Sequence, residues 1–156
     1  MSKPPRLLRA LMAAAVALAG CRATAAGQLQ VVVYEGGQRR ALPVQDASTA
    51  ALLQAVEDSV HAADAVLRLA VTPQLVETLR NDHGCVEVTY PEPRRFTLPL
   101  LQGREVLAQR LLVPLTGELA GTMTTILLDP GSGYRAGPLR ASRPTQPLAR
   151  LAGTGS

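Results

Sequence analysis

Aromatic residues, lysines and cysteines are all scarce in this chain. Its 156 residues include no Trp, one Phe, three Tyr and two Cys, and Lys3 is the only lysine. A hydrophobic core built without rings must consist mainly of Leu, Val and Ala. Few aromatic side chains also means few platforms on which nucleic-acid bases could stack. Two cysteines cannot form a disulfide framework, so the fold has to depend on its core.

Strong charge of one sign is lacking as well. The formal net charge is +4, and three of the positive charges, Lys3, Arg6 and Arg9, lie among the first nine residues. The rest of the chain carries only about +1. Nucleic-acid binding requires a clustered basic face that makes many phosphate contacts, so we expect no nucleic-acid partner.

Apolar residues, in contrast, are plentiful. Hydrophobic residues make up 47% of the chain, which is too many for disorder over most of its length. The length suits one globular domain. The first residues differ in pattern, because a basic segment is followed by the uncharged run 10–20. As a helix this run would reach about 17 Å, well short of the ~30 Å hydrocarbon core of a bilayer. This pattern is typical of a secretory signal peptide.

The apolar run ends in Leu18-Ala19-Gly20-Cys21. This sequence resembles the lipobox of bacterial lipoproteins, in which an aliphatic residue and two small residues precede a cysteine. The resemblance implies that diacylglycerol is attached to the Cys21 thiol, that the signal peptide 1–20 is removed, and that the new amino terminus is acylated. Two or more acyl chains hold a protein stably on a bilayer. Residues 21–27 would then form a lipidated tether.

The residue after the cysteine bears on the destination of the protein. Arg22 stands where the aspartate of enterobacterial lipoproteins favours retention in the inner membrane. By this resemblance we expect the periplasmic face of the outer membrane rather than the inner membrane. The alternative is ordinary signal-peptidase cleavage after Ala25, at the A-x-A site 23–25, which would release a soluble secreted or periplasmic factor.

Residues 28–140 are predicted to form a single α+β domain. Gly36 and Gly37 lie between two strand-like runs and favour a tight hairpin. Apolar residues recur at helical spacing over 49–63, and Thr72-Pro73 is typical of the start of a second helix. Before this helix, 66–71 is predicted to be a strand. Period-two patterns predict a strand over 86–90 that ends at Pro91 and Pro93, another over 96–100, and further hairpins as far as residue 139. We therefore expect two helices packed on one face of a mostly antiparallel, meandering sheet. The tail 141–156 is polar and rich in Pro and Gly, and is predicted to be disordered.

Cys85 and His83 are the first candidates for a nucleophile and its base. They lie two residues apart across Gly84 in a predicted helix-to-strand turn. Alternation along the strand places Glu87 on the same face as Cys85, and a neighbouring carboxylate weakens a thiol nucleophile by raising its pKa. We therefore expect Cys85 to be a structural residue and predict no catalytic residues, while a thiol enzyme or hydrolase using this pair remains the alternative.

No metal site or cofactor is expected. A metal would require His61 and His83 to be brought together from different elements, and nothing in the pattern predicts this. Two basic doublets, Arg39-Arg40 and Arg94-Arg95, flank predicted hairpin turns. Their charge keeps sheet edges soluble, or else forms a docking patch for a partner. The sequence thus predicts a lipid-anchored, non-catalytic binding or assembly module that has a protein partner in the envelope.

Overall fold

The computed structural model describes residues 27–154. The predictions on the signal peptide, on Cys21 and on cleavage after Ala25 lie outside these residues. The described part contains the following elements: β1 (Gln30–Glu35), β2 (Gln38–Leu42), α1 (Ala47–His61), β3 (Ala63–Val66), α2 (Pro73–Asn81), β4 (Cys85–Leu98), a short 3₁₀ helix η1 (Pro99–Leu101), β5 (Arg104–Pro114), β6 (Thr124–Asp129), β7 (Leu139–Ala141) and α3 (Gln146–Ala152).

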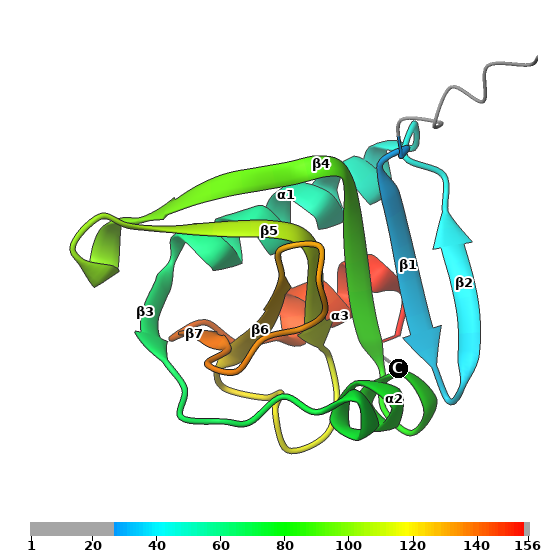
Figure 1. Ribbon diagram of the computed structural model, residues 1–156. Coiled ribbons are helices and arrows are strands. Elements are labelled where there is room, and N and C mark those ends of the chain that lie inside the picture. Colours follow the sequence, from blue (N-terminus) through cyan, green and yellow to red (C-terminus); the bar gives the residue numbers. More distant parts are fainter. Residues whose placement is uncertain (1–26, 155–156) are drawn as a thin grey trace, which may run out of the picture.

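All neighbouring strands pair antiparallel, in the order β2-β1-β4-β5-β6-β7-β3 (Figure 1). Together with the helices, this seven-stranded sheet confirms the predicted α+β class. The predicted first hairpin is present, with Gly36 and Gly37 at φ angles of 54° and 77°. Such positive φ angles match the turn to the twist of the two strands, and glycine adopts them without steric cost.

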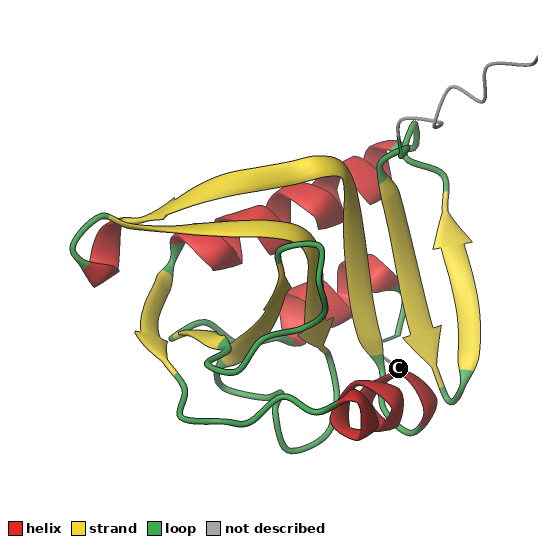
Figure 2. Cartoon of the chain, in the orientation of Figure 1, coloured by secondary structure: helices red, strands yellow, loops and turns green. Residues whose placement is uncertain are grey.

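One face of the sheet carries the main core. Val31, Val33, Val86 and Val88 point to this face and pack with α1, whose buried positions include Leu52. The predicted 3.6-residue spacing of this helix is confirmed, although the helix begins and ends two residues earlier than expected. Two helices do share this face, but the second one is α3, which lies beside α1 behind the sheet in Figure 2.

Helix α2 covers the opposite face. Val76 and Leu79 pack there on Cys85, Leu112 and Leu127. The helix starts as predicted: the Thr72 hydroxyl accepts a 3.2 Å hydrogen bond from the Leu75 N–H, and Pro73 occupies the first helical position. The two helices predicted from sequence therefore lie on opposite faces of the sheet, because the strands between them expose apolar side chains on both sides.

The prediction of a disordered tail over 141–156 is wrong as far as the structure describes it. Ala141 belongs to β7, and the helix α3 buries Leu148, Ala149 and Ala152 in the main core. Thr145, just before the helix, is buried and both accepts from and donates to the backbone of Gly121. The domain thus extends beyond residue 140, because hydrogen bonds and small apolar side chains order a segment that is polar on average.

The predicted strands 86–90 and 96–100 join into one long strand, β4, which ends at Leu98, just before η1 begins. Its pairing with β5 is irregular between Thr89 and Arg94, around Pro91 and Pro93, and the strand bends there instead of ending. Beyond the bend, β4 and β5 form an arm that leaves the rest of the sheet (Figure 1). At its tip, η1 lies next to β3. β3 itself covers 63–66, so the strand expected over 66–71 is wrong in position.

No helix within residues 27–154 combines the length and hydropathy needed to cross a membrane. The apolar run 10–20 lies outside that range.

Candidate functional site

Cys85 is buried beneath α2. Its side chain is fully buried in the small core between α2 and the sheet. Burial, together with the negative charge of Glu87, raises the pKa of the Cys85 thiol to about 12. A thiol with such a pKa is protonated at neutral pH and is a poor nucleophile. His83 lies in the turn before β4, against Gly117. These observations favour the structural interpretation of Cys85 over the thiol enzyme.

The four arginines of the predicted docking patch do not form one surface. Arg39 and Arg40 are neighbours on β2, so their side chains point to opposite faces of the sheet. Arg40 donates a 2.6 Å hydrogen bond to the Ala152 carbonyl at the end of α3. Arg94 pairs with the buried Glu57, and Arg95 pairs with Glu105. Three of the four thus have intramolecular partners, and whether the doublets dock a partner stays a prediction.

The two histidines lie apart in the fold. His61 ends α1, where its Nδ1 is 3.0 Å from the Thr97 carbonyl oxygen and its ring lies beside Phe96. His83 lies near Gly117, in the turn at the other end of β4. Within residues 27–154, no group of three or more His, Cys, Asp or Glu side chains is arranged to hold a metal ion.

The structure shows an arginine–tyrosine cluster that the sequence did not indicate. Arg80 on α2 pairs with Glu87, and Arg110 on β5 pairs with Asp129. Arg80 also lies over the Tyr34 ring and Arg110 over the Tyr134 ring, each 5.5 Å from the ring centroid. A pocket of about 380 Å³ opens between α2 and the loop before Tyr134.

Electrostatic balance limits what this cluster can bind. Each guanidinium already faces a carboxylate with little exposure, and Glu77 lines the same pocket. Burial would raise the pKa of Asp129, but the N–H groups of Gly131 and Gly133 and the Arg110 guanidinium outweigh it and hold this pKa below its ordinary value. The paired charges lock α2 and the loop after β6 onto the sheet, and they leave little net positive charge for an anion.

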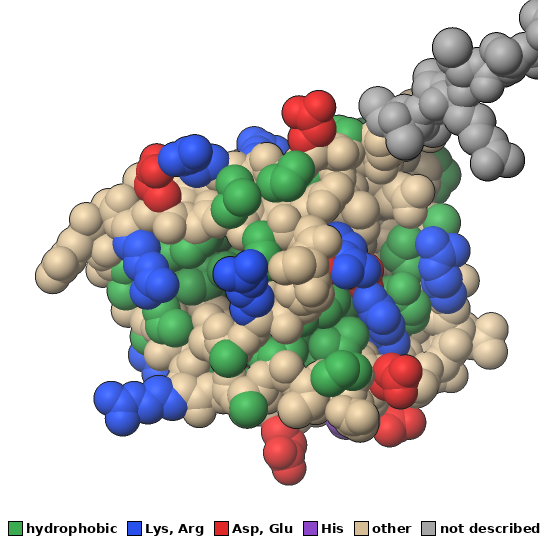
Figure 3. Space-filling view, viewed as in Figure 1, with side chains coloured by type: hydrophobic (Ala, Val, Ile, Leu, Met, Phe, Trp, Pro, Cys, Tyr) green, Lys and Arg blue, Asp and Glu red, His purple; other side chains and the backbone are tan. Residues whose placement is uncertain are grey.

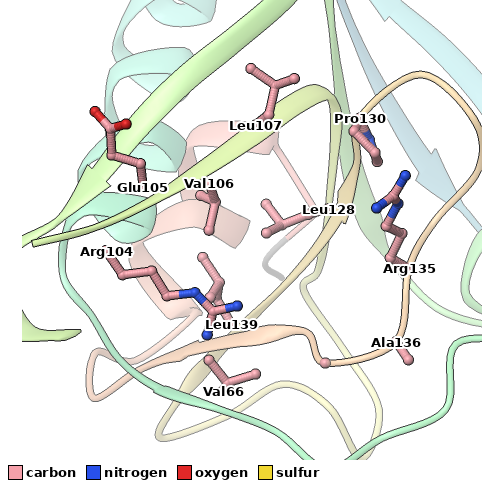
Figure 4. A pocket seen from close by; sticks show the side chains of 11 residues that line it. Val66, Arg104, Glu105, Val106, Leu107, Leu128, Pro130, Arg135, Ala136 and Leu139 are labelled. Carbon is pink, nitrogen blue, oxygen red and sulfur yellow. The ribbon is translucent and has the colours of Figure 1, made fainter.

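A second recess lies between the β4–β5 arm and the β6–β7 hairpin. It has a volume of about 370 Å³, and its lining is mostly apolar, with Val66, Val106, Leu128 and Leu139 among the residues. In Figure 4, Val106 and Arg104 point from β5 into this recess, whereas Glu105 and Leu107 project from the other face of the strand. We call this site the β5 recess.

Two arginines mark opposite ends of the β5 recess. Arg104 lies at the start of β5, and Arg135 lies in the loop before β7 (Figure 4). Neither makes an ion pair with any acid in the described part of the chain. Glu105, the acid of this lining, is already paired with Arg95. Sequence reasoning missed the site because its residues come from separate elements and share no motif.

The comparisons with known proteins give no relative. No family model matches the chain, and neither a curated protein nor a solved structure matches it.

Proposed function

We propose that this protein is a lipid-anchored lipoprotein of the bacterial cell envelope, whose α+β domain is a non-catalytic binding or assembly module. The observation that carries the proposal is the sequence Leu18-Ala19-Gly20-Cys21, which follows a basic segment and a short apolar run. The first strand begins at Gln30, so only a short tether separates Cys21 from the folded domain. The anchor would therefore hold the domain close to the membrane surface.

The binding role is supported by the state of the chemically reactive groups in the domain. The thiol of Cys85 is buried and its pKa is raised. The carboxylates of Glu57, Glu87 and Asp129 are nearly buried and each pairs with an arginine. Such pairs hold a fold in place and are not free to exchange protons with a substrate. The open, mostly apolar β5 recess, in contrast, is of a size that takes ligands.

The membrane face follows from the same motif. Arg22 takes the place of the aspartate that favours retention in the inner membrane, so the proposed location is the periplasmic face of the outer membrane. Fractionation of outer and inner membranes on a sucrose gradient would test it. Recovery of the protein with inner-membrane markers would contradict this part of the proposal while leaving the lipid anchor in place.

Metabolic labelling tests the anchor itself. Cells that express the full chain are grown with radioactive palmitate, and the protein is partitioned between detergent and water. The lipoprotein should be labelled and should enter the detergent phase, whereas Cys21→Ser should do neither. Cys85→Ser is the matched control and should behave like the unchanged protein, since this cysteine lies beneath α2. Label that persists in Cys21→Ser, or an unlabelled protein in the aqueous phase, would overturn the proposal.

A further inference from the structure

The β5 recess combines a free strand edge with an apolar floor. β5 pairs with β4 over Arg104–Ala108 and Arg110–Pro114, but it pairs with β6 only over Arg110–Leu112. Over 104–109, its other edge therefore has no strand partner in the described part of the chain. Along such an edge, alternate residues direct a backbone N–H and a backbone C=O outward. These groups need hydrogen-bond partners, and an added strand supplies them in the matching geometry.

The walls on the far side of the recess are fixed in place. The Arg135 N–H donates to the Leu128 carbonyl, at 3.0 Å. The Gly137 N–H donates to the Leu69 carbonyl, and the Leu67 N–H donates to the Pro138 carbonyl. The segment before β7 is thus held by the chain on both sides, and the opening beside β5 is a built feature of the fold.

Apolar side chains remain exposed at this opening. Val66, at the opening, is 38% accessible to solvent, and Val106, which points into the recess, is only half-buried. In Figure 3, hydrophobic side chains form a floor below the β4–β5 arm, with basic side chains on both sides of it. Covering these apolar groups would be favourable, since burial of apolar surface stabilises a complex.

From these observations we propose that the β5 recess binds an extended peptide segment, which adds a strand to the free edge of β5 and carries acidic groups toward Arg104 and Arg135. This inference deepens the proposed function, on which it rests, by stating how the binding module holds its partner. Strand addition of this kind takes affinity from backbone hydrogen bonds and specificity from alternate side chains.

The geometry also indicates the sequence pattern of the peptide. A strand next to β5 would turn alternate side chains toward Val106, Leu128 and Leu139, so these positions should be apolar. About six residues are needed to follow 104–109 at ~3.4 Å per residue. The unpaired positive charges at the two ends favour a carboxylate at each end of that stretch. An acyl chain would fit the apolar floor, but it cannot supply hydrogen bonds to the strand edge.

Peptide binding can be measured on the full lipidated chain in phosphatidylcholine nanodiscs. The probe is a fluorescent six-residue peptide with alternating valine and threonine in the middle and a glutamate at each end. We expect saturable binding in fluorescence anisotropy, and binding at least about tenfold weaker when both glutamates are replaced by lysine. A third peptide has N-methylated backbone nitrogens and cannot complete the ladder, so it should not bind measurably.

Variants of the two arginines locate the site. Arg104→Ala and Arg135→Ala should each weaken binding of the acidic peptide several-fold, and the exposed Arg68→Ala is the matched control that should leave it unchanged. The double variant Arg104→Glu/Arg135→Glu should prefer the lysine peptide. That exchange of preference shows that the variant is folded, and it cannot result from general loss of structure.

Several results would overturn the inference. No saturable binding of the acidic peptide up to about 1 mM, equal binding of the acidic and basic peptides, or undiminished binding of the N-methylated peptide would each do so. A photoreactive amino acid at position 106, whose side chain points into the recess, could crosslink the chain to a second copy of itself or to phospholipid. Either product would show that the recess holds that occupant and not a peptide. Palmitate labelling of Cys21 is independent of all these results. A failure to bind peptide would therefore leave the proposal of a lipid anchor unaffected.

Discussion

Arg110 donates a 2.6 Å hydrogen bond from its Nε to Oδ2 of Asp129, its direct partner in the β5–β6 register. The other carboxylate oxygen of Asp129 accepts from the N–H groups of Gly131 and Gly133, at 2.7 and 2.8 Å. One fully buried carboxylate thus ties the sheet to the loop after β6. This loop leads to Arg135, and the contact therefore supports one end of the β5 recess.

The first prediction concerns acid stability. These contacts hold the pKa of Asp129 below its ordinary value of 3.8, so the unfolded chain takes up a proton at a higher pH than the folded chain does. The stabilisation is present at neutral pH and is lost as the pH falls below about 4. Urea unfolding from pH 7 to pH 2.5 should show this decline.

Asp129→Asn is the test variant for this effect. It should be less stable than the unchanged protein at pH 7, by about 1–3 kcal/mol, and it should lose less stability on acidification. Some decline should remain, because hydrogen bonding from Ser142 lowers the pKa of Asp64 as well. If the free energy of unfolding falls equally steeply with decreasing pH in the two proteins below pH 4, the role given to Asp129 is contradicted.

The second prediction concerns α3. Leu148 is buried against α1 and the sheet, whereas Leu151, on the same helix, is 39% exposed. We expect Leu148→Ala to lower the free energy of unfolding by about 2–4 kcal/mol, and Leu151→Ala to lower it by less than about 1 kcal/mol. Deletion of residues 141–156 should lower the free energy of unfolding more than either substitution does. A truncated chain whose melting temperature is unchanged would show that α3 does not belong to the core.

The third prediction compares two neighbouring arginines. Arg94 pairs with Glu57, which is nearly buried and also accepts a 3.0 Å hydrogen bond from the Tyr90 hydroxyl. Arg95 pairs with Glu105 in a largely exposed position. Arg94→Ala leaves a buried carboxylate without its counter-charge and should cost about 1–3 kcal/mol, whereas Arg95→Ala should change stability by less than about 0.5 kcal/mol. Equal effects in thermal melts would contradict this difference in burial.

The fourth prediction concerns the Cys85 thiol. In folded Cys21→Ser protein, where Cys85 is the remaining thiol, a chromogenic disulfide reagent at pH 8 should react very slowly, because the thiol is buried and its pKa is about 12. In denaturant the reaction should be complete within minutes. Cys85→Ala should cost about 1–2 kcal/mol and leave peptide binding unchanged. Rapid reaction of the folded protein would favour the thiol-enzyme alternative.

Local signals in the sequence were sufficient for part of the fold. Gly36-Gly37 predicted the first hairpin and Thr72-Pro73 predicted the start of α2, because each depends on backbone preferences within a few residues. The bend in β4 was missed, since Pro91 and Pro93 were interpreted as the end of a strand. In the structure the strand continues past them, and its pairing with β5 resumes at Arg94.

The prediction of a disordered tail over 141–156 was wrong for a different reason. Its two leucines alone do not offset the entropy of ordering some fifteen residues at about 1 kcal/mol each. The structure adds contacts that no local pattern reveals: the Thr145 N–H donates to Gly121, and Arg40 donates to the Ala152 carbonyl. The β5 recess has no local signal for the same reason, because Arg104 and Arg135 lie far apart in the sequence and only the fold brings them to the two ends of one recess.

We expect the mature protein to begin at a lipidated Cys21. Mass spectrometry of the amino-terminal peptide, taken from protein extracted from the envelope fraction, tests it most directly. The expected peptide starts at Cys21 and carries the mass of a diacylglyceryl thioether and an acylated amino group. An unmodified peptide that starts at Ala26, after cleavage at the A-x-A site, would contradict it.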